Sequence, residues 1–71
     1  MRNSIVFLTM LGLVDHIESG YVAAEMTTSD GSLIMKEYPI DLFPCEIQEG
    51  DFFYISKVGG ITEIRCGEPP E

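Results

Sequence analysis

Three side chains in this sequence belong to types that carry out chemistry in proteins: one histidine, His16, and two cysteines, Cys45 and Cys66. A cysteine activated by a histidine can act as a nucleophile, and Cys45 with His16 is the pair that we considered for this role. No nucleophile motif and no glycine-rich phosphate loop accompanies them. We therefore expect no catalytic residue and no enzyme activity, and we interpret His16 as a surface histidine beside Glu18 on one face of a strand.

The cysteines stand far apart in the chain and form no paired Cys-x-x-Cys motif. With a single histidine beside them they do not make a zinc ligand set, and the acidic residues Glu46, Glu49 and Asp51 lack the spacing of a calcium loop. We expect no metal and no other cofactor. Two interpretations of the cysteines stay open. We expect reduced, buried side chains, as is usual in the cytoplasm, and the alternative is one disulfide bridge between them.

The charge of the chain is strongly negative, with 12 acidic residues against 4 basic ones and a formal net charge of −8. Such a surface repels the phosphates of nucleic acids and of anionic membranes. We therefore expect no direct contact with nucleic acid or membrane. A protein partner with a basic surface is compatible with this charge.

The elements that must position these side chains are short strands. The 71 residues predict a single domain, residues 1–71, and the 7 glycines and 4 prolines among them favour an all-β fold with many turns. The apolar run that begins at Ile5 and includes Leu11 is too short to span a membrane, and we expect a strand there in preference to a signal peptide. Strands are predicted at residues 5–11 and 13–18, with 1–12 as an N-terminal extension, then at 21–28, 33–38, 51–57 and 61–66, followed by a flexible tail at 67–71.

The turns between these strands are marked by glycine and proline. Asp30-Gly31 predicts a tight hairpin, Gly12 predicts a bulge, and Pro39 ends the third strand or places it at an edge. A short helical turn capped by Asp41 follows. Its connection is expected to fold back onto the sheet through four apolar side chains: Ile40, Leu42, Phe43 and Ile47.

Strand periodicity assigns the two faces of the sheet. Val22, Ala24 and Met26 share one face of the second strand, and Phe53 and Ile55 share one face of the fourth. Five strands with a capping turn between the third and fourth predict a small closed barrel of the OB-like or Src-homology-3-like type.

Part of the chain resembles a family of short bacterial proteins that is classed as a domain of unknown function. The resemblance covers residues 13–55 and implies a compact β-barrel without known catalytic residues. This chain departs from the family pattern at His16, where arginine is usual, at Phe43, which is inserted, and in its first twelve residues, which are extra. The matching residues are Val14-Asp15-His16-Ile17-Glu18, Gly20, Val22-Ala23, Asp30-Gly31, Leu42-Phe43-Pro44 and Glu49-Gly50-Asp51.

Two functions from different classes fit these features. The first is a non-enzymatic, cytoplasmic interaction module that binds a protein partner through aromatic side chains ringed by acids, with a possible homodimer formed through residues 5–11. The second is an inhibitor of the phage anti-defence type, whose acids imitate the phosphates of a nucleic acid. The candidate partner-binding residues are Glu37, Asp41, Glu46, Glu49, Asp51, Tyr21, Tyr38, Phe52 and Tyr54.

Overall fold

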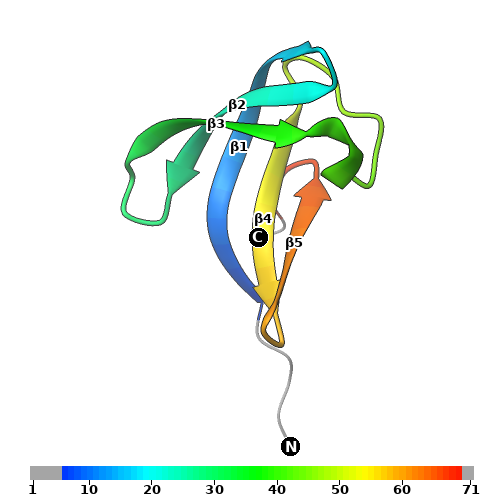
Figure 1. Cartoon of the computed structure of the whole chain (residues 1–71). Helices are drawn as coiled ribbons and strands as arrows, with labels where there is room; N and C mark the ends of the chain where they lie inside the picture. The colour runs from blue at the N-terminus through cyan, green and yellow to red at the C-terminus, as the bar shows by residue number, and fades with distance from the viewer. Residues whose placement is uncertain (1–5, 70–71) are drawn as a thin grey trace, which may run out of the picture.

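The fold is all-β, as predicted. The computed structural model describes residues 6–69, and its strands are β1 (Val6–Glu18), β2 (Tyr21–Thr28), β3 (Leu33–Pro39), β4 (Phe52–Val58) and β5 (Ile61–Cys66). They form one antiparallel sheet in the order β3-β2-β1-β4-β5 (Figure 1). The only helical element among the described residues is a single 3-10 turn, η1 (Ile40–Leu42).

The first two predicted strand segments are one continuous strand, β1, at the centre of the sheet. Its second half pairs with β2 on one side and β4 on the other, whereas its beginning at Val6 pairs with β4 alone. Ile5, where the predicted strand begins, lies outside the described residues. The N-terminal segment is therefore part of the sheet of its own chain from Val6 onward. The bounds predicted for the second and fifth strands are confirmed.

Gly12 does not form the bulge that we predicted. The register of β1 shifts between Val14 and His16 against β2, and between Leu8 and Met10 against β4. Gly12 instead allows a close approach, since a Cβ atom built there would lie 2.6 Å from Cε1 of Phe53 and 2.9 Å from Sδ of Met26. The absence of a side chain at Gly12 gives Phe53 its place in the core.

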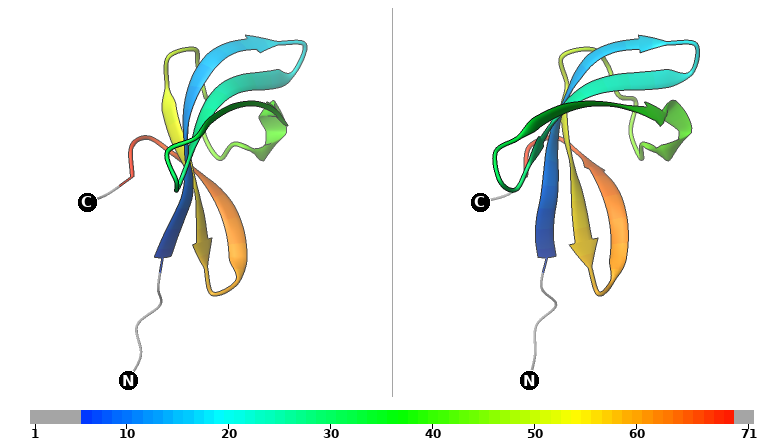
Figure 2. Two further views of the ribbon diagram at one scale, coloured as in Figure 1. Left: turned by 90° about the vertical axis from the view of Figure 1, so that its left-hand side faces the viewer. Right: turned by 60° about the vertical axis from the view of Figure 1, so that its left-hand side comes forward.

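The sheet does not close into the barrel that the sequence predicted. β3 and β5 are its two edge strands, and no pairing joins them in residues 6–69. Figure 2 shows the strands fanning out, so that β3 runs across the direction of β4 and β5. The connection between β3 and β4, residues 40–51, covers the inner face in place of a closing strand pair.

The core lies on the inner face of the sheet. Val22, Ala24 and Met26 are buried there with Phe53 and Ile55, so the predicted faces of the second and fourth strands are confirmed. Val14 completes this layer, and Phe43 and Ile47 cover it from the connection.

Two expectations for the connection are wrong. Leu42 is 55% exposed and does not join the core. η1 begins at Ile40 with Pro39 before it, and no side chain caps it, so Asp41 is not its cap. With the turn starting one residue early, Ile40 packs against the core while Leu42 faces outward.

The turn between β2 and β3 is wider than a two-residue hairpin, although Gly31 has the positive φ angle, 89°, that the Asp-Gly pair predicted. The N–H of Ser32 donates to the carboxylate of Asp30 at 3.0 Å, and the hydroxyl of Thr28 donates to the same carboxylate. These bonds, above all the one from Thr28, lower the pKa of Asp30 to about 2. The carboxylate therefore organises the turn as an acceptor.

The cysteines are bridged, which corrects the expectation that they are reduced. Cys45 in the connection and Cys66 at the end of β5 form a disulfide across a sequence separation of 21 residues. The inward folding of Phe43 and Ile47 brings Cys45 to the last residue of β5. That long-range packing has no local sequence signal, so residue spacing alone did not reveal the bridge.

Gly12→Ala tests the close approach of β1 to Phe53. We expect a loss of about 1–3 kcal/mol in the free energy of unfolding, because overpacking exceeds the gain of under about 1 kcal/mol that alanine brings by restricting the unfolded chain. Urea unfolding measures the change. The cost should shrink in a Phe53→Leu background, and an equal cost in both backgrounds would show that Phe53 is not the cause.

Reduction of the disulfide should lower the free energy of unfolding by about 3 kcal/mol, because the bridge removes loop entropy from the unfolded chain across a separation of 21 residues. The measurement is urea unfolding with and without reductant, together with thiol titration of the native protein. A Cys45→Ala/Cys66→Ala variant should not respond to reductant. Two free thiols in the native protein, with no response to reductant, would contradict the bridge.

Candidate functional site

The disulfide removes the only thiol-based chemistry that the sequence offered. Both cysteines are joined to each other and no cysteine within residues 6–69 is free, so Cys45 has no thiol to form a dyad with His16. The remaining candidate residues are acids and aromatics on the surface. The site that the structure offers is therefore a surface for contact.

His16 is exposed beside an acid, as predicted, but its nearest partner is Asp15. The Nδ1 atom of His16 lies 2.9 Å from Oδ2 of Asp15, whereas its Nε2 atom lies 4.0 Å from Oε1 of Glu18. The hydrogen bond to Asp15 and the negative charges of Asp15, Glu18 and Glu49 raise the pKa of His16 above its ordinary value. The field at this end of the sheet is negative.

Two of the candidate partner-binding residues meet beside this histidine. Tyr21 and Glu37 line a small hollow of about 220 Å³ together with His16 and Glu18. The pairing of β2 with both neighbours explains this, since Ala23 lies opposite both His16 and Glu37. We call Asp15, His16, Glu18, Tyr21 and Glu37 the tip cluster. Sequence analysis missed the part that Asp15 and His16 play in it.

The five candidate acids do not form one row. Glu37 belongs to the tip cluster and Glu49 acts on the same histidine, whereas Asp41 lines a groove beside β5. Glu46 is exposed next to the disulfide. The acids of the connection are thus divided between separate parts of the surface.

Asp51 has a structural role in the turn before β4. Its Oδ2 atom accepts the N–H of Gln48 at 2.9 Å, and its backbone carbonyl accepts the N–H of Val14 at 3.0 Å. A carbonyl of Val14 accepts the N–H of Gly50 at 3.0 Å in return. These bonds attach the connection to β1, so the carboxylate of Asp51 already has a partner.

Tyr38 is part of the core rim. Its ring packs edge-on against Phe43 and Phe53, with centroid distances of 6.4 and 6.2 Å, and Phe43 and Phe53 meet at 4.9 Å. Burial raises the pKa of the Tyr38 hydroxyl. Tyr38 therefore holds the connection onto the sheet, and its ring is half-buried.

The exposed aromatics lie on the outer face of the sheet, away from the core. Phe52 is 38% exposed and Tyr54 is half-buried, which agrees with the predicted alternation along β4. Tyr21 is 51% exposed in the tip cluster. The outer face carries more apolar surface than the aromatics alone.

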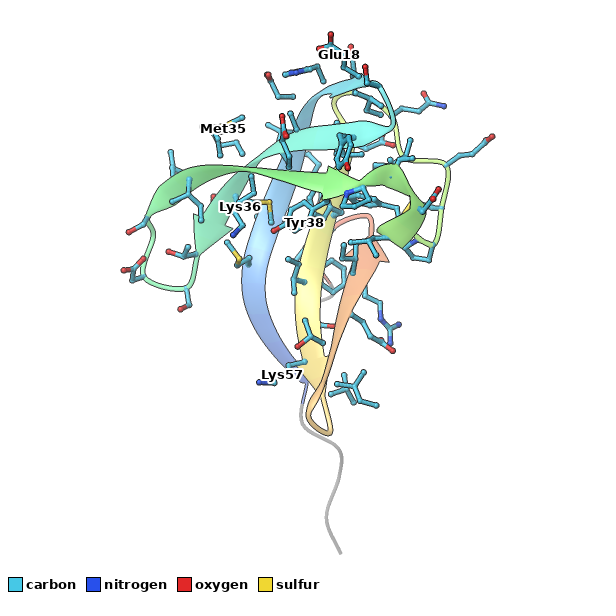
Figure 3. The ribbon with its side chains drawn as sticks, viewed as in Figure 1. Glu18, Met35, Lys36, Tyr38 and Lys57 are labelled. Atoms are coloured by element: carbon cyan, nitrogen blue, oxygen red, sulfur yellow. A yellow bond between two sulfur atoms is a disulfide. The ribbon has the colours of Figure 1, made fainter. Side chains whose placement is uncertain are left out.

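A row of partners crosses four strands on this outer face. Met35 pairs with Glu25, Glu25 with Leu13, and Leu13 with Phe52. Leu33 on β3 lies two positions from Met35, on the same face. Figure 3 shows Met35 on one side of β3 and Lys36 and Tyr38 on the other. We call Leu13, Glu25, Leu33, Met35 and Phe52 the outer patch; all five are exposed.

Sequence analysis missed the apolar members of the outer patch other than Phe52. The available signal was the run Leu33-Ile34-Met35, in which both faces of an edge strand are apolar. A strand with one solvent-exposed face normally alternates apolar with polar residues. Leu33 and Met35 are 61% and 59% exposed, so that departure from alternation marks surface and not core.

Neither a protein-family model, nor a curated protein, nor a solved structure matches the chain. The resemblance to a bacterial family of unknown function stays a prediction. Among residues 6–69, no helix has the length and apolar character needed to cross a membrane.

Asp15→Asn should lower the pKa of His16 toward the ordinary value of 6.5, since it removes the main hydrogen bond that raises it. In the wild type, the stabilisation from protonated His16 is fully present below 6.5 and is lost as the pH rises through the higher folded value. NMR titration of the single histidine measures both values. Glu18→Gln, at the longer distance, should cause a smaller shift; an unchanged pKa in Asp15→Asn would contradict the assignment.

Proposed function

We propose that this chain is a non-enzymatic interaction module that binds a protein partner through the outer patch. The observation that carries the proposal is the uncovered outer face, where Leu13, Met35 and Phe52 lie in one row and remain 37–59% exposed. Contiguous apolar surface of this kind is typical of protein interfaces, and aromatic side chains are frequent anchors in them.

The charges around the patch favour a partner with basic residues. Glu25 stands between Leu13 and Met35 in the row, and within residues 6–69 no basic side chain forms an ion pair with it. The tip cluster adds Glu37 on the same face. A lysine or arginine within an apolar partner surface would meet Glu25, while a second copy would bring the same acid and a net charge of −8. The homodimer stays a prediction that the outer patch does not favour.

Nucleic-acid mimicry is the alternative, and we favour it less. It requires acids at regular spacing along one surface, as phosphates are spaced along a strand. The candidate acids are divided between the tip cluster, the groove beside β5 and the turn braced by Asp51. This distribution supports local charge contacts in place of an extended imitation.

The disulfide bears on where the module works. Stable disulfides are rare in the cytoplasm and common in oxidising compartments. We therefore propose an oxidising compartment in place of the cytoplasm that the sequence suggested. Thiol titration of the protein isolated from its native cells decides this, since two free thiols would restore the cytoplasmic interpretation. For the fold, we propose an open relative of the OB-like or Src-homology-3-like barrel.

Capture from native cells with matched variants tests the outer patch. Met35→Glu and Glu25→Lys should each lower the yield of a basic partner by about tenfold or more, because one removes apolar contact and the other reverses the central charge. Ile61→Glu is the control, since Ile61 is 63% exposed at the opposite hairpin. The purified partner should then bind directly and weaken with salt. Equal capture by all variants would refute the proposal.

A further inference from the structure

The open side of the sheet contains a groove that the outer patch does not use. It has a volume of about 730 Å³ and lies between β5 and the connection that follows β3. We call this the seam groove, since it occupies the place where a closed barrel would join its edge strands. Its lining residues are Tyr38, Asp41, Leu42, Phe43, Pro44, Ile55, Thr62, Glu63, Ile64 and Arg65.

The edge of β5 beside the groove presents backbone groups without a strand partner in residues 6–69. The N–H of Gly67 donates to the carbonyl of Phe52 at 2.8 Å, so these two residues form a hydrogen-bonded pair; Gly67 is thereby held at the start of the predicted flexible tail. Hydrogen-bonded pairs alternate along an antiparallel ladder. The N–H and C=O groups of Thr62 and Ile64 therefore point away from β4, toward the open edge.

The walls of the groove are apolar where a side chain would enter. Ile64 lies opposite Ile55 on the inner face, and the half-buried ring of Tyr38 lies across the groove from β5. Leu42 is 55% exposed at this groove and does not pack into the core. An aliphatic side chain placed between Leu42 and Ile64 would cover both.

The charge of the groove is acidic. Arg65 is already occupied by Glu63, with Nη2 and Oε1 2.7 Å apart. Asp41 lines the groove and forms no ion pair with any basic side chain of residues 6–69. A basic side chain is the complement of this surplus negative charge.

The disulfide joins the two walls. Cys45 follows Pro44 on one wall, and Cys66 follows Arg65 on the other. The covalent bridge holds the walls at one end of the groove before anything binds. Such preorganisation lowers the ordering cost of binding.

We propose that the seam groove binds an extended segment of a protein partner, which adds to β5 as a further strand. Its backbone pairs with Thr62 and Ile64, an aliphatic side chain enters between Leu42 and Ile64, and a basic side chain lies beside Asp41. This mode is β-strand addition, in which main-chain bonds supply affinity and alternate side chains supply specificity. The edge of β3 is also open, but the groove lies beside β5.

This site is separate from the outer patch and is tested separately. The probe is a synthetic peptide of alternating valine and lysine with blocked ends, added to oxidised, isotope-labelled protein. We expect the amide exchange of Thr62 and Ile64 to slow by about tenfold or more when the peptide saturates the site. The same peptide N-methylated at every residue should not cause this protection, because it has lost its donors.

A charge swap identifies the groove as the binding place. Asp41→Lys should weaken binding of the valine–lysine peptide by about threefold to tenfold and strengthen binding of a valine–glutamate peptide. Glu46→Lys makes the same charge change outside the groove and should retain the original preference. Both positions are exposed, so both variants are expected to fold.

Three results would overturn the proposal. The first is no saturable protection at about 1 mM peptide, which is weaker than useful strand addition. The second is protection along β3, at Leu33, Met35 and Glu37, in place of β5. The third is an unchanged peptide preference in Asp41→Lys. None of these results bears on the Glu25→Lys and Met35→Glu tests of the outer patch.

Discussion

The packing of Phe53 against the bare backbone of Gly12 is the constraint on which the rest of the structure depends. Phe53 is fully buried and touches the central strand where no side chain intervenes. Its ring then meets Phe43 at 4.9 Å, and Tyr38 packs edge-on against both. Through these contacts one aromatic side chain joins the sheet to the connection that covers it. Aromatic burial of this size dominates the energetics of a small core.

The connection replaces strand pairing as the means of covering the inner face. Phe43 and Ile47 fill the space that a closing strand pair would fill, and the Cys45–Cys66 bridge secures them to β5. This arrangement explains why the sheet is open and why a groove remains beside β5. It also leaves both edge strands and the outer face accessible. A net charge of −8 opposes association of identical copies through those surfaces.

Local signals predicted the local structure well. Alternation gave correct faces for β2 and β4, and glycine and proline marked the ends of the strands. The errors concern distant partners. Gly12 was assigned a bulge because Phe53 is far away in the sequence, and Leu42 was placed in the core because only its type was visible. Tyr38, the disulfide and the tip cluster have the same explanation: each depends on a pairing that no local pattern contains.

The position of β1 at the centre of the sheet has a consequence for the order of folding. β2 and β3 follow β1 through short turns, and β4 and β5 form their own hairpin. The ladder between Leu13 and Phe52 is the one pairing that closes a long stretch of chain, so it carries the largest loop entropy. We expect two preformed hairpin units to dock along β1 and β4. Because Gly12 and Phe53 lie on that ladder, the docking step and the completion of the core are the same event.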